Sequence, residues 1–192
     1  GEIDGPRMDL LVYVPNDAKG PVPAFIGLNF WGNHAIHPDP GIRLTDSWVE
    51  DNKQPYVDLA GVDKHKATDA TRGVNAKQWP VETILSRGYA LATIYREDVA
   101  ADHEPYFASG VHPLFPDYQK TDDNFGTIAA WAWSFSRALD ALEKEPLIDS
   151  KRVAIFGFSR LGKAALWAGA NDPRIAMVIS NESGAGGAKL FR

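Results

Sequence analysis

Residues 152–179 carry the pattern that most constrains the fold of this chain. Residues 152–156 and 175–179 are short apolar runs rich in β-branched residues, and residues 160–170 between them are rich in alanine. The two runs have the composition of buried strands, and the segment between them that of a helix. A strand, a helix and a strand in this order form a βαβ unit, whose strands lie parallel through a right-handed crossover. The sequence therefore predicts an α/β fold with a mixed, mostly parallel sheet flanked by helices.

Other segments supply further strands to the same fold. Apolar runs at residues 8–15 and 22–30 predict two strands, and the turn-forming residues between them favour an antiparallel pair. Residues 89–95 have the composition of a central strand. A short helix over residues 79–86, ended by Gly88, is expected to precede that strand.

The clearest helix covers residues 128–142, where apolar side chains recur at helical spacing on one face. Asp122, Asp123 and Asn124 precede it, and we expect them to cap its start. Residues 32–75 show no periodicity. Stretches of this length without secondary structure are uncommon in compact domains and often carry function.

Composition excludes several classes of function. The 192 residues carry 20 Lys and Arg against 25 Asp and Glu, whereas nucleic-acid binding needs a concentrated basic surface. No apolar stretch approaches the ~18 residues of a membrane span, and the lack of cysteine rules out disulfides and a cysteine nucleophile. We expect no nucleic-acid or membrane partner, no cofactor and no metal, since His34, His37 and Asp39 lack the spacing of a zinc site.

The most informative residues lie where the strand at 152–156 meets the following helix. The segment GFSRLGK, residues 157–163, places Ser159 on a sharp strand-to-helix turn. In α/β-hydrolases such a turn exposes the nucleophile above the sheet and points the N-terminus of the helix at the developing oxyanion. The segment departs from the pattern G-x-S-x-G, because Leu161 occupies the second position after the serine. A serine that only caps the helix is the alternative.

Two cations favour the catalytic interpretation of this turn. Arg160 and Lys163 fall in the first turn of the helix, where its dipole disfavours positive charge by ~0.3–1 kcal/mol each. Ser159 and Lys163 are four residues apart, which would place them on one helical face. A cationic first turn beside an exposed hydroxyl suits negative charge that develops on a substrate. Two solvated surface cations are the simpler alternative.

A second polar junction follows the next strand. The segment NESGAGG, residues 181–187, begins at the same edge of the predicted sheet as Ser159. Open parallel sheets gather their functional groups at this carboxyl edge. Glu182 is therefore a candidate for the acid of a catalytic triad, in which it would orient a histidine. A solvated loop carboxylate is the alternative.

These two segments together resemble the glucuronoyl esterases, a family of carbohydrate esterases. The family signature is G-C-S-R-x-G-K followed by E-S-G-x-G-G, which matches residues 157–163 and 182–187. The upstream segment LNFWGNH, residues 28–34, is similar to the bacterial branch of the family. The similarity is dense over residues 153–187 and sparse elsewhere. Phe158 replaces a cysteine of the fungal members, which excludes a disulfide at that position.

The resemblance implies a role for each matching residue. Ser159 would be the nucleophile, Arg160 the oxyanion stabiliser and Glu182 the triad acid, whereas Lys163 would contact hydroxyls of the glucuronoyl ring. His34, after the second strand, would line the substrate site, although a structural loop histidine is the alternative. The implied substrate is an ester between 4-O-methyl-glucuronic acid of xylan and an alcohol of lignin. Such a polymer lies outside cells, so we expect a secreted or periplasmic protein.

The histidine of the triad has no candidate after Ser159, because all five histidines precede it. The order in α/β-hydrolases is serine, acid, histidine. We therefore expect residues 1–192 to be part of a single α/β-hydrolase catalytic domain. The C-terminal remainder, a second segment or chain of the same protein, would carry the histidine. An upstream histidine that breaks the usual order is the alternative.

Other functions remain open on the sequence alone. An acetyl-xylan esterase or a peptidase of the same superfamily would keep the fold and the nucleophile. Arg160 and Lys163 speak against it, because a simple acetyl ester offers no ring hydroxyls for Lys163. A carbohydrate-binding module that has lost catalysis is a third possibility, disfavoured by the intact Ser159 and Glu182.

Overall fold

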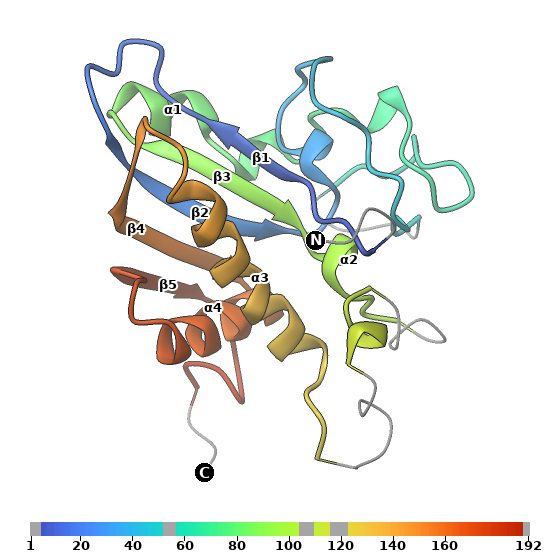
Figure 1. The fold of residues 1–192 in the computed structure, drawn as a ribbon. Coiled ribbons are helices and arrows are strands. Elements are labelled where there is room, and N and C mark those ends of the chain that lie inside the picture. The colour runs from blue at the N-terminus through green and yellow to red at the C-terminus, as the bar shows by residue number, and fades with distance from the viewer. Residues whose placement is uncertain (1–4, 52–56, 104–109, 116–122, 190–192) are drawn as a thin grey trace.

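The structure, a computed structural model, describes residues 5–51, 57–103, 110–115 and 123–189. These residues form a single sheet in the order β1-β3-β2-β4-β5 (Figure 1). β1 runs antiparallel to β3, and the other neighbouring pairs are parallel. This confirms the predicted α/β fold with its mixed, mostly parallel sheet. The strands are Leu10–Tyr13 (β1), Val22–Asn29 (β2), Ala90–Tyr95 (β3), Ile148–Phe158 (β4) and Met177–Asn181 (β5).

Helices cover both faces of this sheet. The long helix α3, Thr127–Leu142, and the helix α4, Arg160–Asn171, pack together on one face (Figure 1). The short helix α1, Val81–Ser86, lies on the other face against β3, and α2, Arg96–Val99, directly follows β3. None of the helices formed by the described residues is long and apolar enough to cross a membrane. Short 3-10 helices lie at Asn33–Ala35, Asp69–Thr71, Ala76–Gln78 and His112–Leu114.

The main core lies between the sheet and the pair α3 and α4. Trp131, Phe135 and Leu139 of α3 are fully buried there, which accounts for the helical spacing of apolar residues in the sequence. The predicted βαβ unit is also present, because β4, α4 and β5 follow one another and β4 pairs in parallel with β5. A smaller core, which includes Trp79 and Leu91, lies under α1 on the opposite face.

The predicted antiparallel pairing of the first two strands is wrong. β3 lies between β1 and β2, and it pairs with both. Every residue of β3 is buried, so this strand needs a neighbour at each edge and packing on each face. The residues of β1 are only partly buried, which suits a strand at the edge of the sheet.

α3 begins later than the predicted capping residues. Its N-cap is Gly126, which makes no side-chain hydrogen bond to the first turn. Asn124 instead accepts a hydrogen bond from the amide of Phe125, 3.0 Å away. Asp122 lies outside the described residues.

The contact between β2 and β4 can be tested at Gly27. A Cβ atom at this position would lie 2.3 Å from the ring of Phe156, which also packs on Trp79. We expect Gly27→Ala to lower the free energy of unfolding by about 1–3 kcal/mol, because the ring has to move out of its place. Gly20→Ala is the control, since nothing lies within 4 Å of its added Cβ. Equal urea midpoints for the two variants would contradict this packing.

Candidate active site

Ser159 forms the whole turn between β4 and α4. Its backbone has φ 55° and ψ −129°, a left-handed conformation that residues other than glycine rarely adopt. The Ser159 amide donates to the carbonyl oxygen of Asn181 at 2.9 Å, and its own carbonyl accepts from the Gly162 amide at 2.9 Å. The side chain is partly exposed, and its hydroxyl makes no hydrogen bond within the described residues. The sharp turn expected from the sequence is therefore present.

The two glycines of this segment permit the turn. A Cβ at Gly157 would lie 2.2 Å from the carbonyl oxygen of Leu161, and one at Gly162 would lie 3.0 Å from that of Gly157. Leu161, in the first turn of α4, is itself fully buried in the main core. Helix and strand thus approach each other closely at both glycines. The contact at Gly162 shows that the third residue after the serine also has little room for a side chain.

Glu182 lies at the same edge of the sheet as Ser159. β4 and β5 are in register at Phe158 and Asn181, so Ser159 and Glu182 are each the first residue beyond the paired strands. Glu182 has a left-handed φ of 49°, and its side chain is exposed. The next residue, Ser183, is buried and accepts a hydrogen bond from the Ala188 amide at 2.8 Å. The structure therefore brings the predicted nucleophile and acid to neighbouring strand ends.

Lys163 holds the loop that follows Glu182. Its Nζ donates to the carbonyl oxygen of Ala185 at 2.5 Å, leaving two ammonium protons for other acceptors. The expectation that Ser159 and Lys163 share one helical face does not hold, because Ser159 lies outside α4. Contact between Lys163 and a sugar stays a prediction.

Arg160 does not stand as an isolated cation in the first turn of α4. Its Nε contacts the carboxylate of Asp102, and its guanidinium lies 5.3 Å from the centroid of the Phe30 ring. The side chain is 47% exposed. Burial lowers the pKa of Arg160 and the Asp102 carboxylate counteracts this, so the guanidinium stays charged. Asp102 thus offsets the repulsion between this cation and the helix dipole.

A buried group of charges stands behind Arg160. Asp102 also binds Arg96 at 3.1 Å, and Arg96 binds Glu97 at 2.5 Å. The Glu97 side chain is 2% exposed, and burial raises its pKa to about 7. His103 lies 3.7 Å from Glu97 and stacks on Trp48. The sequence reasoning missed this group, although charged residues directly after the apolar run at 89–95 were a signal for it.

His34 is buried in the structure, and its contact with a substrate stays a prediction. It is fully buried, and its Nε2 lies 2.9 Å from the hydroxyl of Thr71. Burial, and then the charge of Arg72, lower the pKa of His34 to about 4. A neutral buried ring bonded to a loop hydroxyl favours the alternative of a structural loop histidine.

The other histidines also have partners away from the elbow. His37 is hydrogen-bonded to Glu82 at 2.8 Å. Nδ1 of His65 lies 3.1 Å from the carbonyl oxygen of Val49 and 3.3 Å from the carboxylate of Asp51. His103 lies against Glu97 and Trp48, and His112 stacks on Phe125. None of these contacts involves Ser159 or Glu182.

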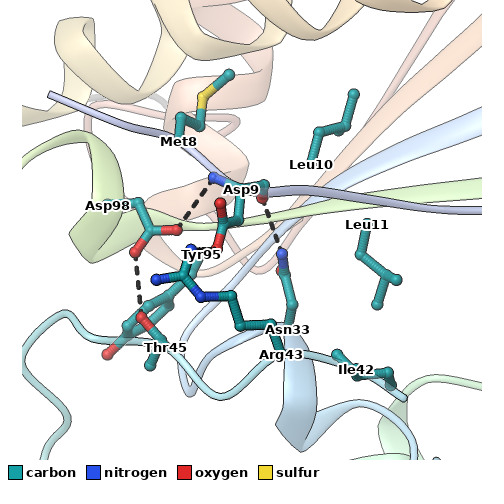
Figure 2. Close-up of a pocket in the computed structure, with 10 residues that line it drawn as sticks. All are labelled: Met8, Asp9, Leu10, Leu11, Asn33, Ile42, Arg43, Thr45, Tyr95 and Asp98. Atoms are coloured by element: carbon teal, nitrogen blue, oxygen red, sulfur yellow. Dashed lines mark hydrogen bonds and ion pairs between the residues drawn. The ribbon is translucent and has the colours of Figure 1, made fainter. Parts of the chain in front are cut away.

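A pocket of about 290 Å³ lies on the β1 side of the sheet rather than at the elbow (Figure 2). Its most buried carboxylate, Asp98, already accepts hydrogen bonds from Ser47 at 2.6 Å and Thr45 at 3.2 Å. None of the predicted site residues lines it. Across the part of the chain that the structure describes, no group of three or more His, Asp or Glu is arranged to hold a metal ion. The carboxyl edge of β4 and β5, where Ser159 and Glu182 lie, stays the predicted site.

Comparison with known proteins decides the family. A family model described as glucuronyl esterase, fungi, matches residues 62–192. Carbohydrate esterase MZ0003, from an unknown prokaryotic organism, is 48% identical over 98% of this chain. A glucuronoyl esterase structure from Solibacter usitatus is 44% identical over 97% of the chain, with a TM-score of 0.85. The chain belongs to the glucuronoyl esterase family.

Two further relatives carry information on ligands. A protein of Phanerochaete chrysosporium named 4-O-methyl-glucuronoyl methylesterase 1 is 41% identical over 81% of the chain and 36% of its own length. A serine-to-alanine mutant of the Sporotrichum thermophile glucuronoyl esterase was solved with methyl 4-O-methyl-β-D-glucopyranuronate. That structure is 25% identical, with a TM-score of 0.52, over 93% of this chain and 35% of its own. This glucuronoyl esterase chain has the α/β-hydrolase fold of its relatives and spans 43–46% of the length of MZ0003 and the Solibacter protein.

The buried carboxylate of Glu97 predicts a pH-dependent stability. Its pKa of about 7 in the folded protein exceeds the ordinary value of 4.5, so the folded state holds this proton more tightly than the unfolded state. The contribution of Glu97 to stability therefore falls as the pH rises from about 4.5 to about 7. We expect Glu97→Gln to remove roughly 2–3 kcal/mol of this fall, measured by urea unfolding at pH 5 and pH 8. Asp17→Asn, which changes an exposed carboxylate, is the control. If the free energy of unfolding of Glu97→Gln depended on pH as strongly as that of the wild type, the raised pKa of Glu97 would be contradicted.

Proposed function

We propose that the protein is a serine carboxylic-ester hydrolase that cleaves esters between 4-O-methyl-glucuronic acid of xylan and alcohols of lignin. The observation that carries the proposal is the left-handed turn at Ser159, beside the strand end that bears Glu182. Within the described residues, the hydroxyl at this turn makes no hydrogen bond. Membership of the glucuronoyl esterase family supports the substrate class. Because its substrate is a polymer of the plant cell wall, we propose that the protein acts outside cells and in lignocellulose degradation.

The chemistry follows from the position of each group. The hydroxyl oxygen of Ser159 attacks the carbonyl carbon of the uronate ester and passes its proton to a general base. The oxyanion of the tetrahedral intermediate is stabilised by the Arg160 guanidinium and by the free amide groups at the start of α4. The alcohol leaves with the proton from the base, and an acyl-enzyme on Ser159 stays behind. Water then hydrolyses the acyl-enzyme and releases the uronate.

The general base is a histidine that Glu182 orients through its carboxylate. The five histidines of the chain have other partners, as described above. We therefore propose that the base comes from a region of the protein outside these 192 residues. The exposed Glu182 side chain is suited to receive it, because no hydrogen bond or ion pair occupies this carboxylate within the described residues.

The cations at the elbow favour a uronate over a simple acetyl ester. The exposed end of Arg160 and the two remaining Lys163 protons can donate hydrogen bonds to oxygen atoms of a sugar ring. An acetyl group has no such oxygen atoms beyond the ester itself. We propose that Lys163 contacts ring hydroxyls while it holds the loop at Ala185 in place.

Replacement of the nucleophile tests the proposal. In the full-length protein, Ser159→Ala should lower kcat for benzyl glucuronate by at least about 10³-fold, because no acyl-enzyme can form. Ser86→Ala, which removes an exposed hydroxyl from α1, should leave kcat unchanged. Retained turnover in Ser159→Ala would overturn the assignment of the nucleophile. Faster turnover of acetylated xylan than of the uronate ester by the wild type would overturn the substrate.

A further inference from the structure

A shared carboxylate connects the elbow to the buried charges behind it. Asp102 follows α2, and a single oxygen of its carboxylate contacts both Nε of Arg160 and Nη1 of Arg96. The same two guanidinium groups lie 5.3 and 5.4 Å from the centroid of the Phe30 ring. Two cations are thus held against one aromatic ring and joined by one carboxylate. We call Arg160, Asp102, Arg96 and Phe30 the arginine clamp.

The sheet register explains why these residues meet. Asn29 pairs with Tyr95, so the next residues, Phe30 and Arg96, adjoin at the ends of β2 and β3. Gly27 pairs with Phe156, and continuing that register places Phe30 opposite Ser159. Phe30 therefore lies between Arg96 and Ser159 at the ends of three neighbouring strands. The Arg160 side chain runs from the elbow toward the end of β2.

We propose that Asp102 is a positioning residue for ester hydrolysis, which fixes the Arg160 guanidinium over Phe30 so that its outer nitrogen atoms face the oxyanion at Ser159. The inference rests on the proposed function, because it names the group that sets the oxyanion stabiliser in place. It concerns a residue that never touches the substrate and acts only through Arg160.

The binding mode of Arg160 carries the proposal. Asp102 occupies Nε, the nitrogen nearest the backbone, and no hydrogen bond occupies the two Nη atoms within the described residues. Those two atoms form the fork that binds oxyanions. The Asp102 side chain is 20% exposed, so solvent screens this contact only in part. A long, half-exposed arginine side chain would otherwise sample many rotamers, and fixing the group costs conformational entropy.

The arginine clamp leaves Arg160 with a net positive charge toward the elbow. Arg96 and Arg160 share Asp102, and Arg96 takes Glu97 as a second partner. The one negative charge of Asp102 is therefore shared between two guanidinium groups, and it does not fully neutralise Arg160. The exposed end of the guanidinium keeps a positive potential where an oxyanion develops.

The test measures kcat and KM for benzyl glucuronate in the full-length protein. Asp102→Asn should lower kcat about 10-fold and change KM less than about twofold, because a misplaced guanidinium weakens the transition state more than the ground state. Asp140→Asn is the matched control, since Asp140 is likewise shared by two arginines, Arg137 at 2.9 Å and Arg174 at 2.8 Å, but lies on α3. The control should keep kcat within about twofold of the wild type.

A double-mutant cycle separates positioning from general stabilisation. In the Arg160→Ala background, Asp102→Asn should cause no further loss of kcat, because its only route to the reaction has been removed. Asp102→Glu keeps the charge that Arg96 needs and moves the carboxylate outward. The melting temperature of Asp102→Glu should be close to that of the wild type, and its kcat should still be lower. This variant keeps the proposal testable if Asp102→Asn does not fold.

Three results would overturn the proposal. One is a loss of kcat in Asp102→Asn no larger than in Asp140→Asn, and another is an equal loss with and without Arg160. The third is additive shifts in melting temperature for Asp102→Asn and Arg160→Ala, which would show that the clamp does not exist. If the wild type hydrolyses no ester, the proposed function fails, while the melting temperatures still decide whether Asp102 holds Arg160.

Discussion

The close approach of Gly157 to the carbonyl oxygen of Leu161 is the constraint on which the site depends. At this contact α4 begins so close to β4 that only one residue, Ser159, makes the turn. A left-handed serine costs of order 1–3 kcal/mol. Two hydrogen bonds of the Ser159 backbone and the burial of Leu161, a residue of α4, in the main core hold it in place. Packing of the helix on the sheet thus stabilises the strained backbone of Ser159, which turns the hydroxyl away from the strand.

The charges at the elbow show the same dependence on distant parts of the fold. Two cations in the first turn of α4 are unfavourable for the helix itself. Asp102, from the segment after α2, accepts Arg160, and the Ala185 carbonyl accepts Lys163. Each cation is therefore held by a group that another strand end supplies. The helix tolerates them because the parallel sheet brings four strand ends to one edge.

Features encoded by a short stretch of sequence were predictable, and features that join distant stretches were not. The βαβ unit, α3 and the turn at Ser159 follow from local periodicity and from glycine spacing. The strands have similar compositions, so composition does not show which of them pair with β3. Local patterns favoured the pairing of β1 with β2, whereas β3 lies between these two strands. The burial of His34 depends on Thr71, which lies 37 residues later in a segment without periodicity. The arginine clamp joins three strand ends, so its members carried no common signal.

Solvent-accessible polar groups that make no hydrogen bond within the described residues set the elbow apart from the clusters at Asn29 and Asp98. Buried Asn29 is bonded through both ends of its amide, and Asp98 accepts three hydrogen bonds. These groups are structural, because folding has already used their bonding capacity. Within the described residues, the Ser159 hydroxyl, the Glu182 carboxylate and the outer nitrogen atoms of Arg160 make no such bonds. Their backbones are fixed while their functional atoms stay available, and a preorganised site has to combine these two properties.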